Sequence, residues 1–204
     1  KEKAAWGDWL VDNCDKWWIQ AKTPHTTNQA PVVPNPAAIK SCEMNQDILR
    51  NDWGKMVGNS GISNIWGQMV VDQEDEKLVI GTAQPGPDWN ATFRPGPNLF
   101  AAAILKVDAV TGEIDWAYQT TTRDPWDYDC SWNTILAEDV VVKGELRDKV
   151  VIKGCKNGRV YILDYADGAP LHVFESVNTR RTPFAELLDP LNDVEMVRRT
   201  ANTC

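Results

Sequence analysis

Long apolar runs are missing from this sequence. The longest, Leu99 to Leu105, covers seven residues, whereas a helix that crosses a bilayer needs about 20 consecutive apolar residues. A transmembrane span is therefore not expected, and this run has the length of a strand. Basic residues are also outnumbered, because 21 Lys and Arg face 29 Asp and Glu, for a net charge of −8. Since phosphate binding relies on clustered Lys and Arg, neither a nucleic acid nor an anionic membrane is expected as a partner.

Histidines are scarce, and closely paired cysteines are absent. The two histidines, His25 and His172, have no sequence neighbours that mark them as metal ligands or catalytic bases. The five cysteines contain no Cys-x-x-Cys pair, which argues against a zinc site and against an attached c-type haem. The sequence begins at Lys1 and has no signal-peptide pattern. We therefore expect it to be a processed or excised piece.

The sequence does contain a repeat of β-rich units. The run Asp-Ala-Val-Thr-Gly ends at Gly112 and the run Asp-Tyr-Ala-Asp-Gly ends at Gly168, and each lies between two β-rich stretches. Thr-Gly and Asp-Gly are typical of tight hairpin turns, because glycine accepts a positive φ. Two further β-rich stretches precede each copy. We therefore expect strands at 66–71, 78–82, 101–107 and 113–119, then at 135–142, 149–153, 159–163 and 171–174.

This pattern predicts an all-β fold. Two four-stranded antiparallel units, at about 66–120 and 134–176, are typical of propeller blades. Two blades cannot close a ring, which needs about 4–8 of them. The sequence thus predicts a β-propeller segment with about two complete blades, part of a larger propeller. Two unrelated meanders in a sandwich remain the alternative.

The flanks of the repeat have a different composition. Residues 1–55 are rich in Trp and Pro and predict an irregular covering segment, with a short helix near 37–49 and tryptophans that act as packing anchors. Residues 56–177 hold the two blades. Residues 178–204 predict a helical or loop extension, in which Thr182 caps a helix that begins with Pro183.

Two carboxylates lie in the loop between the units, in the run Asp-Pro-Trp-Asp-Tyr-Asp that ends at Asp129. Asp127 and Asp129 can meet one cation, or one can bind a cation while the other accepts a proton. A turn rich in Asp and Pro is the alternative. In a meander, the start of the first strand, the second-to-third connection and the loop into the next unit share one face, which brings Trp66, Gln84 and Lys156 to the carboxylates. Such a set suits a flat anionic cofactor and a hard cation.

Several motifs in order over about residues 50–176 resemble the quinoprotein alcohol and methanol dehydrogenases. They are the runs 81–90 and 94–99, the run from Thr111-Gly112 through Trp116 to Asp129, and the run from Lys156-Asn-Gly to Asp164. The resemblance implies an eight-bladed propeller that oxidises alcohols with pyrroloquinoline quinone and a bound calcium or lanthanide ion. It further implies an extracytoplasmic location, such as the periplasm, and a separate electron acceptor such as a cytochrome or copper protein. The remainder of the propeller would be a partner of this segment.

The resemblance also assigns cofactor contacts. Asp127 matches the catalytic base, which takes the hydroxyl proton of the alcohol. Trp66 matches the tryptophan that forms the floor under the quinone, and Asn64 lies near a polar contact to it. Lys156 matches the cation that contacts the quinone oxygens.

The metal ligands implied by the resemblance are Gln84, Asp127 and Asp129. Asp129 matches the extra carboxylate of lanthanide-type members, whereas Gln84 stands where the family usually has Asn. The metal-binding Glu and the adjacent-cysteine motif of the family are not found here. These departures leave a second hypothesis open, a cofactor-free propeller that serves as a binding scaffold.

Two further expectations concern cross-links and packing. An extracytoplasmic location makes disulfides plausible, and Cys14–Cys42 and Cys130–Cys155 are the hypothetical pairs. Trp116 is expected on an outer strand, packed against the neighbouring blade.

Overall fold

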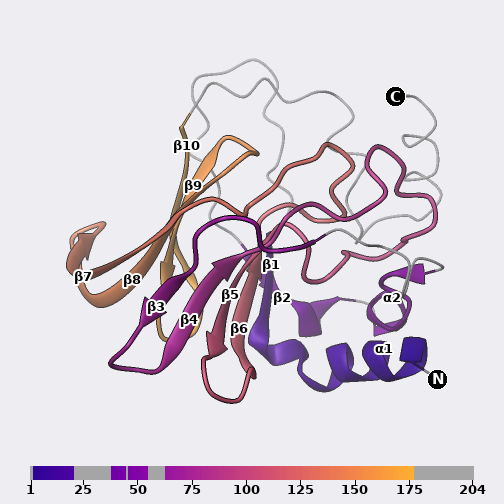
Figure 1. The fold of residues 1–204 in the computed structure, drawn as a ribbon, viewed down its shortest axis with the longest axis horizontal. Helices are drawn as coiled ribbons and strands as arrows, with labels where there is room; N and C mark the ends of the chain where they lie inside the picture. The colour runs from indigo at the N-terminus through magenta and orange to yellow at the C-terminus, as the bar shows by residue number, and fades with distance from the viewer. Residues whose placement is uncertain (1, 21–37, 45, 55–62, 177–204) are drawn as a thin grey trace.

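The computed structural model of the protein describes residues 2–20, 38–44, 46–54 and 63–176. Two β-sheets lie side by side, and helices α1 (Glu2–Asp12) and α2 (Gln46–Arg50) lie beside the first sheet (Figure 1). None of the described helices is long and apolar enough to cross a membrane. The helix that we expected after Thr182 falls outside the described residues.

The first sheet contains a four-stranded antiparallel meander. Its strands are β3 (Val70–Asp72), β4 (Lys77–Gly81), β5 (Ala103–Asp108) and β6 (Ile114–Gln119). The predicted first strand was placed too early, because Trp66 precedes β3. Two strands that were not predicted extend the sheet to six: β1 (Trp17–Gln20) pairs in parallel with β6, and β2 (Ala38–Lys40) pairs with β1.

The second sheet is a complete meander of four consecutive strands. They are β7 (Thr134–Val142), β8 (Glu145–Cys155), β9 (Arg159–Asp164) and β10 (Pro170–Glu175). The β5–β6 and β9–β10 turns contain Gly112 and Gly168 at φ +77° and +73°, a conformation that glycine adopts without a steric penalty. The predicted all-β fold with two antiparallel units is confirmed.

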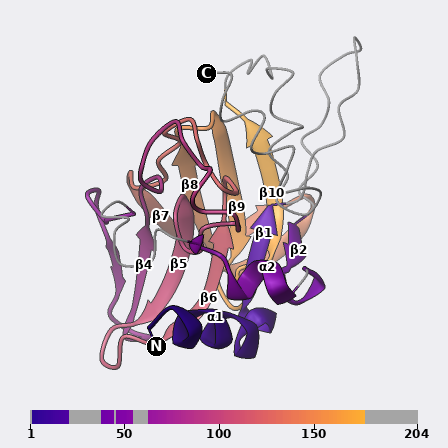
Figure 2. The same cartoon turned by 90° about the vertical axis from the view of Figure 1, so that its right-hand side faces the viewer.

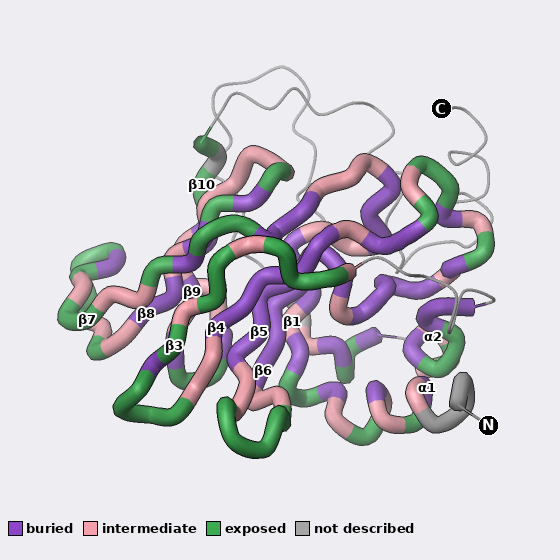
Figure 3. The backbone as a smooth tube through the Cα atoms, in the orientation of Figure 1, coloured by how far each residue is buried: buried purple, intermediate pink, exposed green. Residues whose placement is uncertain are grey.

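A core of alternating side chains lies between the two sheets. Trp116 and Tyr118 of β6 pack with Val151, Tyr161 and other buried residues of the second sheet, and β5 and β6 each carry a continuous buried stretch (Figure 3). The Trp116 indole Nε1 donates a hydrogen bond to the carbonyl of Tyr165 at 2.9 Å. The expected packing of Trp116 on the neighbouring blade is confirmed, but β6 is not an outer strand because β1 pairs with it.

The opposite face of the first sheet packs against the N-terminal segment. Leu10 and Leu49 of the two helices meet Ile80, Leu105 and Ala117 of the sheet in a second core. The segment is more regular than predicted: α1 is a helix of 11 residues, and the helix expected near 37–49 is reduced to α2, since 38–40 form β2 and 41–43 form a 3-10 turn. The rings of four aromatic residues pack against one another in this core, as the packing-anchor interpretation predicts: Trp6, Trp9, Trp17 and Phe100.

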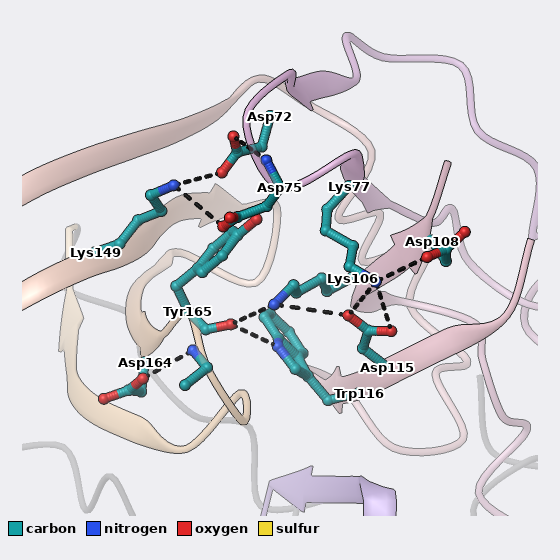
Figure 4. Close-up of polar contacts among 11 residues, drawn as sticks. Asp72, Asp75, Lys77, Lys106, Asp108, Asp115, Trp116, Lys149, Asp164 and Tyr165 are labelled. Atoms are coloured by element: carbon teal, nitrogen blue, oxygen red, sulfur yellow. Dashed lines mark hydrogen bonds and ion pairs between the residues drawn. The ribbon is translucent and has the colours of Figure 1, made fainter. Parts of the chain in front are cut away.

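Charged side chains join the sheets at the end where the β3–β4, β5–β6 and β9–β10 turns lie (Figure 4). Lys149 of β8 donates to Asp72 at 2.6 Å and to Asp75 at 3.3 Å, across the sheet boundary. The hydrogen bond to Asp72 lowers the pKa of this carboxyl group to about 2. On the first sheet, the Lys77 ammonium lies 2.9 Å from Asp108. These ion pairs hold the two sheets together at this end, and the long loops lie at the other end.

Candidate functional site

The long connections gather at the end of the sheets opposite the charged turns, as alternating strand directions require (Figures 1 and 2). They are the β4–β5 loop (82–102) and the β6–β7 loop (120–133), and the short β8–β9 turn (156–158) lies at the same end. Backbone hydrogen bonds tie them together: Cys130 donates to the carbonyl of Thr82 at 3.1 Å, and Lys156 donates to the carbonyl of Asp129 at 3.0 Å. Residues from both blades therefore meet at one place.

The two predicted carboxylates converge on one cationic group. The Lys156 ammonium donates to Asp127 Oδ2 at 2.5 Å and lies 3.6 Å from Asp129 Oδ2. Asp129 Oδ1 accepts the backbone N–H of Gln84 at 3.1 Å. The hydrogen bond to Asp127 and the nearby charges of both carboxylates raise the pKa of Lys156. Two carboxylates and one ammonium leave this cluster with a net charge of −1, so it can attract a further cation.

The loop that carries the carboxylates is held by Asp124, a residue for which the sequence suggested no role. Its carboxylate is buried and accepts the backbone N–H groups of Trp126 at 2.7 Å and Tyr128 at 2.5 Å. These two residues flank Asp127, which has φ +67°. Burial raises the pKa of Asp124 to about 6. Asp124 thus fixes the backbone on both sides of Asp127, and with it the direction of the Asp127 side chain.

Two buried arginines order the longer β4–β5 loop. Arg94 donates to Asn98 Oδ1 at 2.5 Å and to the carbonyl of Asp124 at 2.8 Å. Arg123 donates to the carbonyl of Ala91 at 2.9 Å. Both side chains are almost fully buried. They join the β4–β5 loop to the loop of Asp127, so the long connection is a structured wall of the site.

Asp52 closes this wall from the segment after α2. Its carboxylate accepts the backbone N–H groups of Asn98 at 2.5 Å and Leu99 at 2.8 Å. Burial raises the pKa of Asp52 to about 7, although these hydrogen bonds and the charges of Arg123 and Arg94 oppose the increase.

A pH-dependent stability is expected from Asp52. The pKa of Asp52 is raised in the folded protein. Its contribution to the free energy of unfolding is therefore fully present below about pH 4 and is lost as the pH rises through about 7. Each pH unit in this window changes the free energy of unfolding by up to about 1.4 kcal/mol. Asp52→Asn should remove this dependence, and it should lower stability by about 1–3 kcal/mol through the lost acceptor. Urea unfolding of the unmodified protein and of Asp52→Asn at pH 5 and pH 8 measures the difference between their free energies of unfolding. This difference should be smaller at pH 8. An equal difference at both pH values contradicts the assignment.

The remaining predicted site residues contact the loops that carry this cluster. The carbonyl of Asn64 accepts the backbone N–H of Ala83 at 3.0 Å, and its side chain is exposed. Trp66 is half exposed, and its ring meets Trp132 edge-on at 5.3 Å between centroids. The Gln84 side chain donates to Asp88 Oδ1 at 3.2 Å, so its backbone N–H, rather than its amide, contacts Asp129.

The donor chemistry of the cluster fits a hard cation only in part. The carboxylates of Asp127 and Asp129 already share one ammonium, and carboxylate oxygens are the ligands that calcium prefers. Among the described residues, however, no group of three or more His, Cys, Asp or Glu is placed to hold a metal ion. Since calcium takes about 6–8 oxygen ligands, other ligands must come from outside these residues.

The fold defines this chain as a segment of a propeller. Two carboxylates and one ammonium lie together at the end of its sheets where the long loops are. The family model described as "PQQ: Glucose/ethanol/alcohol dehydrogenase, beta-propeller domain" matches residues 42–186. The chain belongs to this family.

Relatives of this chain are named as alcohol and methanol dehydrogenases. The chain is 34% identical over 133 residues to methanol dehydrogenase [cytochrome c] subunit 1 of Methylobacterium organophilum, covering 64% of this chain and 21% of that protein. It is 32% identical over 180 residues to the dehydrogenase subunit of alcohol dehydrogenase (quinone) of Acetobacter aceti, covering 85% of this chain and 23% of that protein. The chain thus spans about a fifth of the length of these relatives.

Solved structures of dehydrogenases are also similar to this chain. Quinohemoprotein alcohol dehydrogenase ADHIIG of Pseudomonas putida HK5 matches with a TM-score of 0.58 and 34% identity, over 65% of this chain and 20% of that chain. A europium-containing methanol dehydrogenase matches with a TM-score of 0.53 and 34% identity, over 57% of this chain and 20% of that chain. The likeness therefore covers a part of each propeller.

Proposed function

We propose that this chain is a segment of an extracytoplasmic quinone-dependent alcohol dehydrogenase, in which it supplies the catalytic base and part of the cofactor pocket. The observation that carries the proposal is the convergence of Asp127, Asp129 and Lys156, from two blades, at the loop end of the sheets. Family membership and the names of the relatives support the reaction class.

Asp127 is the proposed catalytic base. Its side chain is 29% exposed, so a small alcohol can reach it. Its Oδ2 atom accepts a hydrogen bond from the Lys156 ammonium, and a positioned carboxylate can take a proton as a general base. Asp127 would take the proton of the alcohol hydroxyl, and Asp124 would hold the loop so that the carboxylate faces the substrate.

Pyrroloquinoline quinone, when bound, supplies the acceptor for the hydride of the alcohol. In this chain Trp66 would lie under it, because an exposed indole offers a flat apolar surface. Asn64, exposed beside it, would offer a polar contact. Lys156 is 39% exposed at its side chain and would offer its ammonium to the quinone oxygens.

The proposed metal is a calcium or lanthanide ion. Asp127 and Asp129 would supply carboxylate oxygens to it, and Gln84 an amide oxygen, since its Nε2 donates to Asp88. The match to a europium-containing methanol dehydrogenase supports a lanthanide. The other ligands would come from the remainder of the propeller, which is the first proposed partner.

A separate electron acceptor is the second proposed partner. The names of several relatives include cytochrome c, and those of several others include quinohemoprotein. These names favour a cytochrome over a copper protein, and they are consistent with the proposed periplasmic or other extracytoplasmic location.

Metal dependence tests the proposed function. A propeller that contains this chain is loaded with pyrroloquinoline quinone and either calcium or a lanthanide, and dye-linked alcohol oxidation is measured. The protein should be active, and Asp129→Ala should lose about tenfold or more of its activity with the lanthanide but less with calcium, because a trivalent ion gains more from an additional carboxylate. Asp148→Ala, which removes an exposed carboxylate near the start of β8 and outside the loops of the site, is the control. If the loaded protein binds neither quinone nor metal, a binding scaffold is the better description.

A further inference from the structure

A disulfide joins the two blades inside the site. Cys130 of the β6–β7 loop pairs with Cys155 at the end of β8, and their Cα atoms lie 4.5 Å apart. Cys130 directly follows Asp129, and Cys155 directly precedes Lys156. The covalent bond therefore connects the immediate neighbours of two charged residues that belong to different blades.

Without the disulfide, only non-covalent contacts would hold these charges together, among them the hydrogen bond from the Asn157 side chain to the carbonyl of Thr120 at 3.1 Å. Lys156 lies in the short turn closed by the hydrogen bond from Gly158 to the carbonyl of Cys155 at 3.0 Å. Its backbone bond to Asp129 crosses between the blades. Its long side chain is 39% exposed, and a partly exposed ion pair must hold its side chains in place at a cost in conformational entropy. A cross-link one residue away reduces this cost, because the backbone positions are already fixed.

The surroundings of the cross-link suit a permanent connection. Cys130 and Cys155 are buried at 0% and 8% exposure among Tyr118, Tyr161 and other members of the core between the sheets. This core is already closely packed by large side chains, so the disulfide adds a constraint on position at the site as well as stability.

We infer that the Cys130–Cys155 disulfide is a positioning device that holds the Lys156 ammonium on the Asp127 and Asp129 carboxylates. For catalysis, the inference rests on the proposed function, since Lys156 would contact the quinone and Asp127 would be the base. The placement of Lys156 itself is a property of this chain and can be measured without any cofactor.

The second disulfide provides a matched control. Cys14 and Cys42 are 28 residues apart in the sequence, and Cys130 and Cys155 are 25 apart. In the chain-entropy description, the stabilisation depends on the logarithm of this separation, so both cross-links restrict the unfolded chain to nearly the same degree. Cys14–Cys42 lies in the N-terminal segment, away from the loop end. If only the loss of Cys130–Cys155 changes the behaviour of Lys156, the change therefore reports the position of Lys156 and not the general loss of a cross-link.

The experiment compares Cys130→Ala/Cys155→Ala with Cys14→Ala/Cys42→Ala in the full protein. The rate at which acetic anhydride modifies Lys156 is measured by mass spectrometry, with Asp127→Asn, which keeps only Asp129 as a charged partner, as the reference for a weakened ion pair. A lysine that leaves its carboxylate partners is more accessible to the reagent, so the rate should increase when Lys156 loses the contacts to Asp127 and Asp129. In the quinone-loaded propeller, the dissociation constant of pyrroloquinoline quinone is measured as well.

The site variant should react faster at Lys156, toward the rate of Asp127→Asn, and should bind the quinone about tenfold more weakly, as expected for the loss of one charge-assisted hydrogen bond. The control variant should match the unmodified protein in both measurements. If the alanine variant does not fold, Cys130→Ala/Cys155→Val refills part of the volume of the sulfurs and takes its place.

Equal Lys156 reactivity in the two double variants overturns the inference. Failure of the proposed function has a different signature: the unmodified protein would not bind the quinone, while the reactivity of Lys156 would still differ between the two double variants.

Discussion

Replacing Asp127 by Asn should reduce alcohol oxidation by about 10²–10⁴-fold in the quinone-loaded propeller, the usual contribution of a positioned general base. The amide has nearly the same shape as the carboxylate but cannot accept the hydroxyl proton. The backbone at φ +67° tolerates Asn, which adopts this region more readily than most residues. The urea unfolding curve should therefore shift little, and the loss should appear in dye-linked turnover.

Asp139→Asn is the control for this variant. Asp139 is an exposed Asp with φ +52° in β7, so the same substitution is made on a similar backbone conformation in a strand and not in the loops that form the site. Its turnover should equal that of the unmodified protein. Full activity of Asp127→Asn would remove the base from the proposed mechanism and would favour the scaffold hypothesis.

Replacing Trp116 by Ala should destabilise the protein by about 3–5 kcal/mol, the range for a buried Trp truncated to Ala. The side chain is 2% exposed and fills the core between the two sheets. A Cβ added at Gly168 would lie 2.5 Å from its Cε3 atom, so the neighbouring turn packs directly on the ring. Urea unfolding measures the loss as a lower midpoint.

Trp116→Phe separates packing from hydrogen bonding. It keeps an aromatic ring but removes the donor to the carbonyl of Tyr165, which still accepts a hydrogen bond from Lys106 at 3.2 Å. The loss should therefore be clearly smaller than for Ala. A destabilisation by Trp116→Ala of less than about 1 kcal/mol would mean that the two sheets do not depend on each other through this core.

The strands of the two blades follow from local sequence patterns. The turns at Gly112 and Gly168 and the β-rich stretches around them are readable because hairpin strands pair with their neighbours in the chain. The pairing of β1 with β6 has no such signal: it joins Trp18 to Tyr118, and a short apolar stretch does not identify a distant partner. Helix α1 did have a signal that the prediction missed, the spacing of Trp6, Trp9 and Leu10 at i, i+3 and i+4.

Within the site, the chain order of the loops was enough to bring Gln84, Asp127, Asp129 and Lys156 to one end, because strand directions alternate. The supporting charges were not predictable in this way. Arg94 and Asp52 act on backbone groups far away in the sequence, and their burial becomes visible only in three dimensions. Asp124 had a local signal, since an Asp two residues before Trp126 can accept its N–H in an Asx turn.

The pairing of β1 with β6 also affects how the chain meets other molecules. Without it, the six residues of β6 would offer a row of free backbone donors and acceptors, the kind of strand edge on which a second chain can align. With it, the sheet ends at β2, a strand of three residues. A short terminal strand is a poor template for intermolecular pairing, so the N-terminal segment protects this edge of the blade from self-association.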